Sequence, residues 1–231
     1  MLQSRVQLKL DFYVVIIYNK SAEILRSKEY RITVTLLFLY LGGSAMCSNE
    51  IKDCFERSPV IAAVQNSMLS QALNSPVEII FNLKVSLLDI EDSINLVHSA
   101  GKKIFIHIDL ADGIGKDKSG IEYLAKLGVD GIISTKGQLI RYANDVGLVT
   151  VQRFFALDSK GVDSIGEMLE SAKPDLIEIM PGIASKVIKR FVSGGVPVIA
   201  GGLIETKQEI TEALKNGAEA ISTGKEDLWY I

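Results

Sequence analysis

The chain has 231 residues, of which 48% are hydrophobic, and its mean hydropathy is +0.25. That is enough for a sizeable core, so the length fits one barrel or, failing that, two small domains. The net charge is −3, but the first 45 residues hold six Lys/Arg against three Asp/Glu, which leaves 19 against 25, or −6, for the rest. A net-negative body excludes nucleic-acid binding through a broad basic face, so any such role depends on a local patch.

The first 45 residues differ from everything that follows. They contain two apolar runs, Phe12–Tyr18 and Thr33–Leu41, and the second has basic residues before it and Gly42-Gly43-Ser44-Ala45 after it. This outline is typical of a signal peptide, but the run is only about nine residues long, too short to span a membrane, and lies deep in the chain. We predict that residues 1–45 form an extension outside the fold and that residues 46–231 form a single domain.

The two cysteines, Cys47 and Cys54, lie close together near the predicted start of the fold. No metal-type partner pattern accompanies them. We therefore interpret them as reduced thiols, which are usual in a cytoplasmic protein.

From Met46 onward, short β-branched runs alternate with helix-period stretches. Eight runs are predicted strands: Val60–Gln65, Glu78–Leu83, Lys103–Leu110, Gly131–Thr135, Leu148–Arg153, Leu176–Met180, Pro197–Ala200 and Glu219–Thr223. The predicted helices between them are Asp89–Ala100, Gly120–Leu127, Gln138–Val146, Ser164–Ala172, Ser185–Val192 and Glu209–Asn216. Eight strand–helix repeats predict a closed (β/α)8 barrel of the TIM type, and the alternative is a doubly wound open sheet.

Two glycine-containing turns follow the last two predicted strands. Ala200-Gly201-Gly202-Leu203-Ile204 leads into a helix, and Ser222-Thr223-Gly224 ends the next apolar run. Glycines between a strand and a helix let the backbone approach a ligand, and the start of the helix offers unpaired N–H groups to an anion. In such a barrel, this pair of turns predicts a phosphate site made by Gly201, Gly202, Ser222, Thr223 and Gly224; the alternative is a pair of ordinary tight turns.

Strand alternation predicts which side chains point into the barrel. In Ile104–Asp109 the isoleucines share one face, and Phe105, His107 and Asp109 share the other. Applied to each strand, the rule predicts an inward polar set near the strand ends: Gln65, His107, Asp109, Gln152 and Glu178, with Arg153 at the rim. Buried polar groups need partners, so this set indicates a small polyhydroxylated ligand. The alternatives are an internal Glu178–Arg153 ion pair and a core histidine at His107.

The glycine-punctuated segment 111–120 follows the third predicted strand, and it is either a lid over the site or a solvated loop. Asp109, His107 and Glu178 together also contain the ligand types of a metal site. However, no pair of ligands spaced four residues apart supports a metal. We expect neither a metal nor a cofactor.

The order of several short segments is specific. They are His107–Leu110, Gly131–Lys136, Gln152–Ser159, Ile177–Gly182, Ala200–Thr206 and the closing Leu228-Trp229. In this order, from Pro59 to Trp229, the chain resembles the glycerol uptake operon antiterminator regulatory proteins, which are glycerol-3-phosphate-responsive antiterminators.

The resemblance implies a cytoplasmic, non-enzymatic regulator of glycerol metabolism that binds glycerol 3-phosphate and then the mRNA leader of a glycerol-utilisation transcript. It implies no membrane association, and it leaves the oligomeric state open, with a homo-oligomer among the options. The candidate RNA-binding cations are Lys116, Lys118, Lys136, Arg141, Lys186, Lys189 and Arg190. For the last three, which share one predicted helix, the alternative is an ordinary solvated face.

The alternative function is an isomerase or epimerase acting on a small sugar or polyol phosphate, because a barrel fold does not fix function. Asp109, His107 or Glu178 would then do the acid–base work. An aldolase is disfavoured, since Lys136 is the only lysine at a predicted strand end available for a Schiff base.

Overall fold

The computed structural model describes residues 43–231, with side chains from Glu50 onward except that of Asn66. Residues 44–231 form one compact unit. The predicted extension, residues 1–45, lies almost entirely outside the described residues.

Eight parallel strands close into a barrel, as predicted. The strands are β1 (Val60–Gln65), β2 (Ile79–Lys84), β3 (Lys103–His107), β4 (Gly131–Ser134), β5 (Val149–Phe155), β6 (Leu176–Met180), β7 (Val198–Gly201) and β8 (Ala220–Thr223). Each strand pairs with the next, and β8 pairs with β1. That last pairing closes the sheet, so the open-sheet alternative is wrong.

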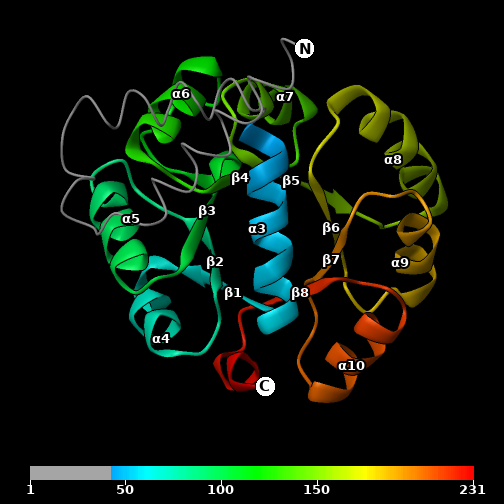
Figure 1. Ribbon diagram of the computed structural model, residues 1–231. Coiled ribbons are helices and arrows are strands. Elements are labelled where there is room, and N and C mark those ends of the chain that lie inside the picture. Colours follow the sequence, from blue (N-terminus) through cyan, green and yellow to red (C-terminus); the bar gives the residue numbers. More distant parts are fainter. Residues whose placement is uncertain (1–42) are drawn as a thin grey trace, which may run out of the picture. The chain divides into compact units, whose positions relative to one another are not determined.

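The connecting helices pack around the outside of the strands (Figure 1). They are α4 (Leu69–Asn74), α5 (Ile90–Ser99), α6 (Lys118–Leu127), α7 (Gly137–Asp145), α8 (Ser159–Ala172), α9 (Ser185–Val192) and α10 (Lys207–Lys215), with 3-10 turns η2 (Asn66–Met68), η3 (Ile108–Leu110) and η4 (Glu226–Tyr230). Sequence patterning missed the short α4. It also extended the third strand to Leu110, whereas β3 ends at His107 and the chain turns into η3.

Alternate residues of each strand enter two different apolar cores. Ile104, Ile106 and Ile108 pack with the surrounding helices, whereas Phe105 packs inside the barrel against Phe81. This confirms the predicted phase of β3. Parallel strands of such barrels are covered on both faces, so both faces are apolar and only the residues near the strand ends are free to be polar.

Helix α3 (Gly43–Arg57) lies across one end of the barrel (Figure 1). Its side chains Ile51, Cys54 and Phe55 are buried in the interior cluster. The helix leads directly into β1, with the Ser58 N–H donating to the Cys54 carbonyl at 2.8 Å. It therefore covers the end at which the strands begin, and leaves the opposite end, at the C-termini of the strands, for a site.

We expect Phe55→Ala to lower the free energy of unfolding by about 3–5 kcal/mol, because it opens a cavity under the barrel floor. Urea unfolding measures this change. The exposed neighbour Glu56 is the control, since Glu56→Ala should change stability by less than about 0.5 kcal/mol. A loss below about 1 kcal/mol for Phe55→Ala would show that α3 is not part of the barrel core.

Candidate functional site

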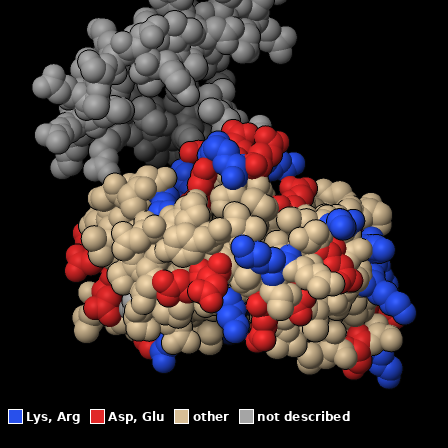
Figure 2. Space-filling model, turned by 90° about the horizontal axis from the view of Figure 1, so that it is seen from below, with Lys and Arg blue, Asp and Glu red and all other residues tan. Residues whose placement is uncertain are grey.

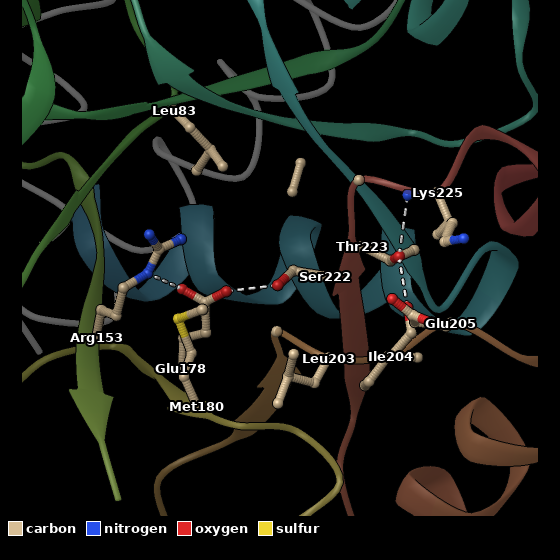
Figure 3. Close-up of a pocket in the computed structure, with 13 residues that line it drawn as sticks. Leu83, Arg153, Glu178, Met180, Leu203, Ile204, Glu205, Ser222, Thr223 and Lys225 are labelled. Carbon is tan, nitrogen blue, oxygen red and sulfur yellow. Dashed lines mark hydrogen bonds and ion pairs between the residues drawn. The ribbon is translucent and has the colours of Figure 1, made fainter. Parts of the chain in front are cut away.

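A cavity of about 350 Å³ opens at the C-terminal mouth of the barrel. Its walls come from the ends of β1, β2, β5 and β6 and from the turns that follow β7 and β8 (Figure 3). The lining residues are Ala63, Leu83, Arg153, Glu178, Met180, Gly202, Leu203, Ile204, Glu205, Ser222, Thr223, Gly224 and Lys225. The two glycine turns singled out in the sequence therefore border one cavity at one end of the molecule.

Glu178 is the polar centre of the cavity wall. Its side chain is fully buried, Arg153 Nε donates to Oε2 at 2.5 Å, and Ser222 Oγ donates to Oε1 at 2.5 Å (Figure 3). Arg153 and Glu178 occupy paired positions on adjacent strands β5 and β6. The ion pair anticipated as the alternative reading of Glu178 is thus present, and it forms one wall of the cavity.

The turn after β7 contains two consecutive residues with positive φ, a conformation that favours glycine. Gly202 has φ +73° and Leu203 has φ 58°, which is rare for a residue with a side chain. Thr206 and Glu209 then form a capping box at the start of α10. Within the described part of the chain, the N–H groups of Leu203 and Ile204 meet no hydrogen-bond acceptor. The turn therefore presents free donors beside the positive end of α10.

The turn after β8 is tied to the turn after β7. Thr223 Oγ1 donates to the Ile204 carbonyl at 3.0 Å and accepts from the Lys225 N–H at 3.1 Å. The buried Trp229 fixes the strand end by donating from Nε1 to the Thr223 carbonyl at 2.9 Å. Gly224 N–H has no acceptor among the residues described here, so both turns offer free backbone donors to the same space.

His107 ends β3 on the inner face of the barrel, as predicted. It is 4% exposed, and neither ring nitrogen has a hydrogen-bond partner among the described residues. Burial, and next the positive charge of Arg153, lower the pKa of His107 to about 4. The ring is therefore neutral at pH 7, with one donor and one acceptor available.

The depressed pKa of His107 makes stability sensitive to acid. The folded value of about 4 lies below the unfolded value of about 6.5, so the unfolded chain takes up the proton first as the pH falls. Its contribution to stability is complete above pH 6.5 and is lost as the pH falls towards 4. We expect His107→Gln to reduce the loss of unfolding free energy between pH 7 and pH 4 by about 3 kcal/mol.

Urea unfolding at the two pH values tests this expectation. His98→Gln replaces the other histidine, a surface residue paired with Asp130, and serves as the control. If His107→Gln loses as much stability as the unsubstituted protein over this range, the buried neutral ring is not the acid-sensitive group.

The carboxylate of Asp109 is already hydrogen-bonded by protein groups. Its carboxylate accepts from Ser134 Oγ at 2.8 Å, from the Thr135 N–H at 2.7 Å and from Thr135 Oγ1 at 2.8 Å. Burial alone would raise the pKa of Asp109, but these hydrogen bonds hold it below its usual value. Asp109 thus fixes the end of β4, and its role as a ligand contact stays a prediction.

Two predicted inward residues lie elsewhere. Gln152 shares the outer face of β5 with Thr150 and Phe154, because Val149 and Val151 fill the interior. A Cβ added at Gly137 would lie 3.5 Å from Gln152 Nε2, which places Gln152 against the start of α7. The prediction that it faces the barrel interior is therefore wrong.

Gln65 is exposed and lies outside the main cavity. The pairing of β1 with β2 shifts register between Val64 and Gln65, which breaks the alternation that predicted an inward side chain. Gln65 lines a separate hollow of about 210 Å³ with Lys84 and Asp112. The prediction that it faces the barrel interior is corrected accordingly.

Segment 111–120 does not line the main cavity. Its Asp112 N–H donates to the Val85 carbonyl at 2.8 Å, and the Leu87 N–H donates to the Asp112 carbonyl at 2.8 Å. Its last three residues already belong to α6, which Asp117 caps by accepting from the Gly120 N–H. The segment is thus anchored to the connection after β2.

The predicted RNA-binding cations divide into engaged and free side chains. Lys116 donates to the Ala111 carbonyl, Lys118 pairs with Glu122, Arg141 donates to Ser171 and Arg190 pairs with Asp163. Lys136, Lys186 and Lys189 are exposed and have no ion pair within the described residues. The face in Figure 2 shows basic and acidic side chains interspersed, in keeping with the acidic composition.

Seven residues that line the cavity are not among the predicted site residues: Ala63, Leu83, Met180, Leu203, Ile204, Glu205 and Lys225. Lys225 follows Gly224 directly and brings an ammonium group to the lining, and Leu203 forms an exposed lip on it (Figure 3). Their adjacency to the two glycine turns was a usable signal. Among residues 43–231 no group of acidic, histidine or cysteine side chains has the arrangement of a metal site, and no helix there is long and apolar enough to span a membrane.

Comparisons with known proteins find a matching family and relatives that share this barrel fold. The family model described as glycerol-3-phosphate responsive antiterminator matches residues 60–229. An antiterminator regulatory protein of the glycerol uptake operon from Listeria monocytogenes is 30% identical, with a TM-score of 0.72 over 74% of this chain and 95% of that one. A related protein from Thermotoga maritima is 35% identical, with a TM-score of 0.67 over 74% and 96%.

A curated relative, the uncharacterized protein YgcP of Escherichia coli K12, is 34% identical over 179 residues, which cover 76% of this chain and 93% of YgcP. The family match covers the whole barrel from β1 to η4, including both glycine turns and the Arg153–Glu178 pair. The chain belongs to the glycerol-3-phosphate responsive antiterminator family.

Proposed function

We propose that this protein is a cytoplasmic transcription antiterminator that senses glycerol 3-phosphate and acts on the mRNA leader of glycerol-utilisation genes. The observation that carries the proposal is that the turns after β7 and β8 border one polar cavity with the Arg153–Glu178 pair. The family supports a regulatory role.

The phosphate is proposed to lie on the Gly201–Gly202 and Ser222–Gly224 turns. The Ser222 and Thr223 hydroxyls already donate to protein oxygens, so the free N–H groups of Leu203, Ile204 and Gly224 are the main donors. The Lys225 ammonium and the start of α10 add positive potential. The charged lining residues are Arg153 and Lys225 against Glu178 and Glu205, so the anion meets no net negative wall.

The glycerol hydroxyls are proposed to meet Glu178 and Arg153, which line the cavity, and to reach His107, which is buried and does not line it. A hydroxyl both donates and accepts, which suits a carboxylate, a guanidinium and a neutral imidazole. His107 is buried with both ring nitrogens unpartnered, so a ligand hydroxyl that reached it would satisfy a costly buried group.

The same contacts favour a regulator over the isomerase or epimerase alternative. General acid–base catalysis needs a group free to exchange a proton with the substrate. Asp109 already accepts three hydrogen bonds, and Glu178 accepts two, one of them from a guanidinium. These two carboxylates bind and orient a ligand without supplying a free base. His107 is neutral and unpartnered, but its pKa of about 4 makes it a weak base at pH 7.

Isothermal titration calorimetry with glycerol 3-phosphate, glycerol and inorganic phosphate tests the ligand. We expect glycerol 3-phosphate to bind at least about 100-fold more tightly than either fragment, because each fragment reaches only half of the contacts. Binding of leader RNA is then measured with and without the ligand. Tight ligand binding without any RNA response would favour the enzyme, and equal affinity for the three small molecules would contradict the proposed site.

A further inference from the structure

A cluster of exposed apolar and basic side chains lies beside the cavity mouth. Three adjacent connections, those after β4, β5 and β6, contribute it. We call it the β4–β6 rim, and its members are Lys136, Phe155, Leu157, Lys160, Ile183 and Lys186. Four of the six, Phe155, Leu157, Lys160 and Ile183, belong to none of the sites described above.

The apolar members are unusually open to solvent. Phe155 is 51% exposed, Leu157 is 83% exposed and Ile183 is 48% exposed. Single exposed apolar residues are common, but several on adjoining loops around a ligand mouth mark a contact surface. Phe155 also follows Arg153 by two residues on β5, and its strand partner is the cavity residue Met180. A molecule resting on Phe155 therefore lies beside the cavity mouth.

The charged members of the rim are all basic. Lys136, Lys160 and Lys186 are exposed and make no ion pair with any described residue. The only acid in the three connections is Asp158, and its carboxylate caps α8 by accepting from the Gly161 N–H at 2.7 Å. At the edge of the rim, Glu209 and Glu212 of α10 share a hollow with Ile183. The N-termini of α7, α8 and α9 follow these connections, which adds the positive ends of three helix dipoles.

We propose that the β4–β6 rim is the surface that binds single-stranded RNA, with a base stacked on Phe155 and phosphates on the three lysines. This inference rests on the proposed function and adds where the RNA lies. Single strands are bound where cations follow the backbone and an aromatic side chain offers a stacking face. A second copy related by a two-fold axis would place these lysines against each other, so charge complementarity favours a polyanion.

Because the strand partner of Phe155 is the cavity residue Met180, RNA on the rim lies beside the exit of the cavity and can extend over it. Bound RNA then slows the release of glycerol 3-phosphate, and by reciprocity the ligand raises the affinity for RNA. The acidic composition is no obstacle, since the contact needs only this local surface.

The test uses the full chain, saturating glycerol 3-phosphate and a fluorescein-labelled pool of random 30-nucleotide single-stranded RNA, followed by anisotropy at several salt concentrations. We expect Lys136→Glu/Lys160→Glu/Lys186→Glu to weaken binding at least about 30-fold and to reduce the log–log salt slope by about 2. The matched control is Lys52→Glu/Lys126→Glu/Lys215→Glu, which makes the same charge change on α3 and at the ends of α6 and α10. It should weaken binding less than about threefold.

The stacking contact has its own pair of variants. Phe155→Ala is expected to weaken RNA binding about tenfold, whereas Tyr123→Ala, which removes an exposed aromatic on α6, should leave it unchanged. In stopped-flow measurements, RNA should slow the dissociation of glycerol 3-phosphate from the unsubstituted protein. It should not do so for the triple lysine variant of the rim, Lys136→Glu/Lys160→Glu/Lys186→Glu, called the rim variant. Without RNA, calorimetry should give the rim variant the ligand affinity of the unsubstituted protein.

Three results would overturn the inference. Equal weakening by both triple variants would place the RNA elsewhere and leave the proposed function standing. Absence of RNA binding by the unsubstituted protein would remove both the inference and the RNA part of the proposed function. A dimer in sedimentation velocity that Phe155→Ala dissociates would assign the rim to a second copy of the chain.

Discussion

Gly201→Ala is expected to weaken glycerol 3-phosphate binding at least about 100-fold while the barrel stays folded. A Cβ at this position would overlap Glu178 Oε1 and lie 2.5 Å from Ser222 Oγ. The added methyl therefore displaces the carboxylate and breaks its hydrogen bond from Ser222. The proposed hydroxyl contacts and the neighbouring phosphate turn lose their geometry together, which corresponds to about 3 kcal/mol of binding free energy.

Gly166→Ala is the matched control for that experiment. Gly166 lies inside α8, and a Cβ there would meet nothing within 4 Å. Alanine in a helix interior should raise stability by about 0.5–1 kcal/mol and leave ligand binding unchanged. Calorimetric titration measures the binding, and thermal unfolding confirms that both variants fold. If Gly201→Ala keeps its affinity within about threefold, the ligand does not bind at the Glu178 wall.

The sequence was most informative where structure follows local periodicity. Strand β6 spans Leu176–Met180 as predicted. Its two isoleucines pack against the helices, so the alternate residues, Glu178 among them, point into the barrel. The glycine turns were predicted from glycines that follow apolar runs. The structure gives the physical reason for these glycines, since Gly202 adopts φ +73° and Gly201 has no room for a side chain. Such requirements leave few residue types possible, and so they are visible in one sequence.

Gln152 shows why the inward set was only partly predictable. Val149 and Val151 do alternate with Thr150 and Gln152, but both faces of a parallel barrel strand are buried. Thr150 and Gln152 lie on the outer face of β5, where Thr150 donates to Asn144 and Asp175. Alternation predicts correctly which residues of β5 share a face. It cannot predict which face points into the barrel, since that depends on packing against distant segments.

Asp109 and Lys160 illustrate two further limits. The turn at η3 that directs Asp109 to Ser134 and Thr135 depends on a contact between connections 25 residues apart. Lys160 appears an ordinary helix residue in the sequence, and its place on the rim depends on β4, β5 and β6 being neighbours. Side chains from separate connections become neighbours only when the barrel closes, so one sequence does not show that they belong together.

Arg153→Met is expected to lower the free energy of unfolding by about 3–5 kcal/mol at pH 7, because it leaves the buried Glu178 carboxylate without its counter-charge. The exposed pair Arg190–Asp163 gives the control, since Arg190→Met should cost less than about 1 kcal/mol. Urea unfolding measures both variants.

The double variant Arg153→Met/Glu178→Gln separates the loss of a pair from the stranding of a charge. The amide oxygen of Gln can still accept from Ser222, and no unpaired charge remains, so most of the lost stability should return. Ligand affinity should not return, because the proposed hydroxyl contacts need both charged groups. If the double variant is as unstable as Arg153→Met alone, the loss comes from packing of the arginine stem, and the Glu178 carboxylate is solvated through the cavity.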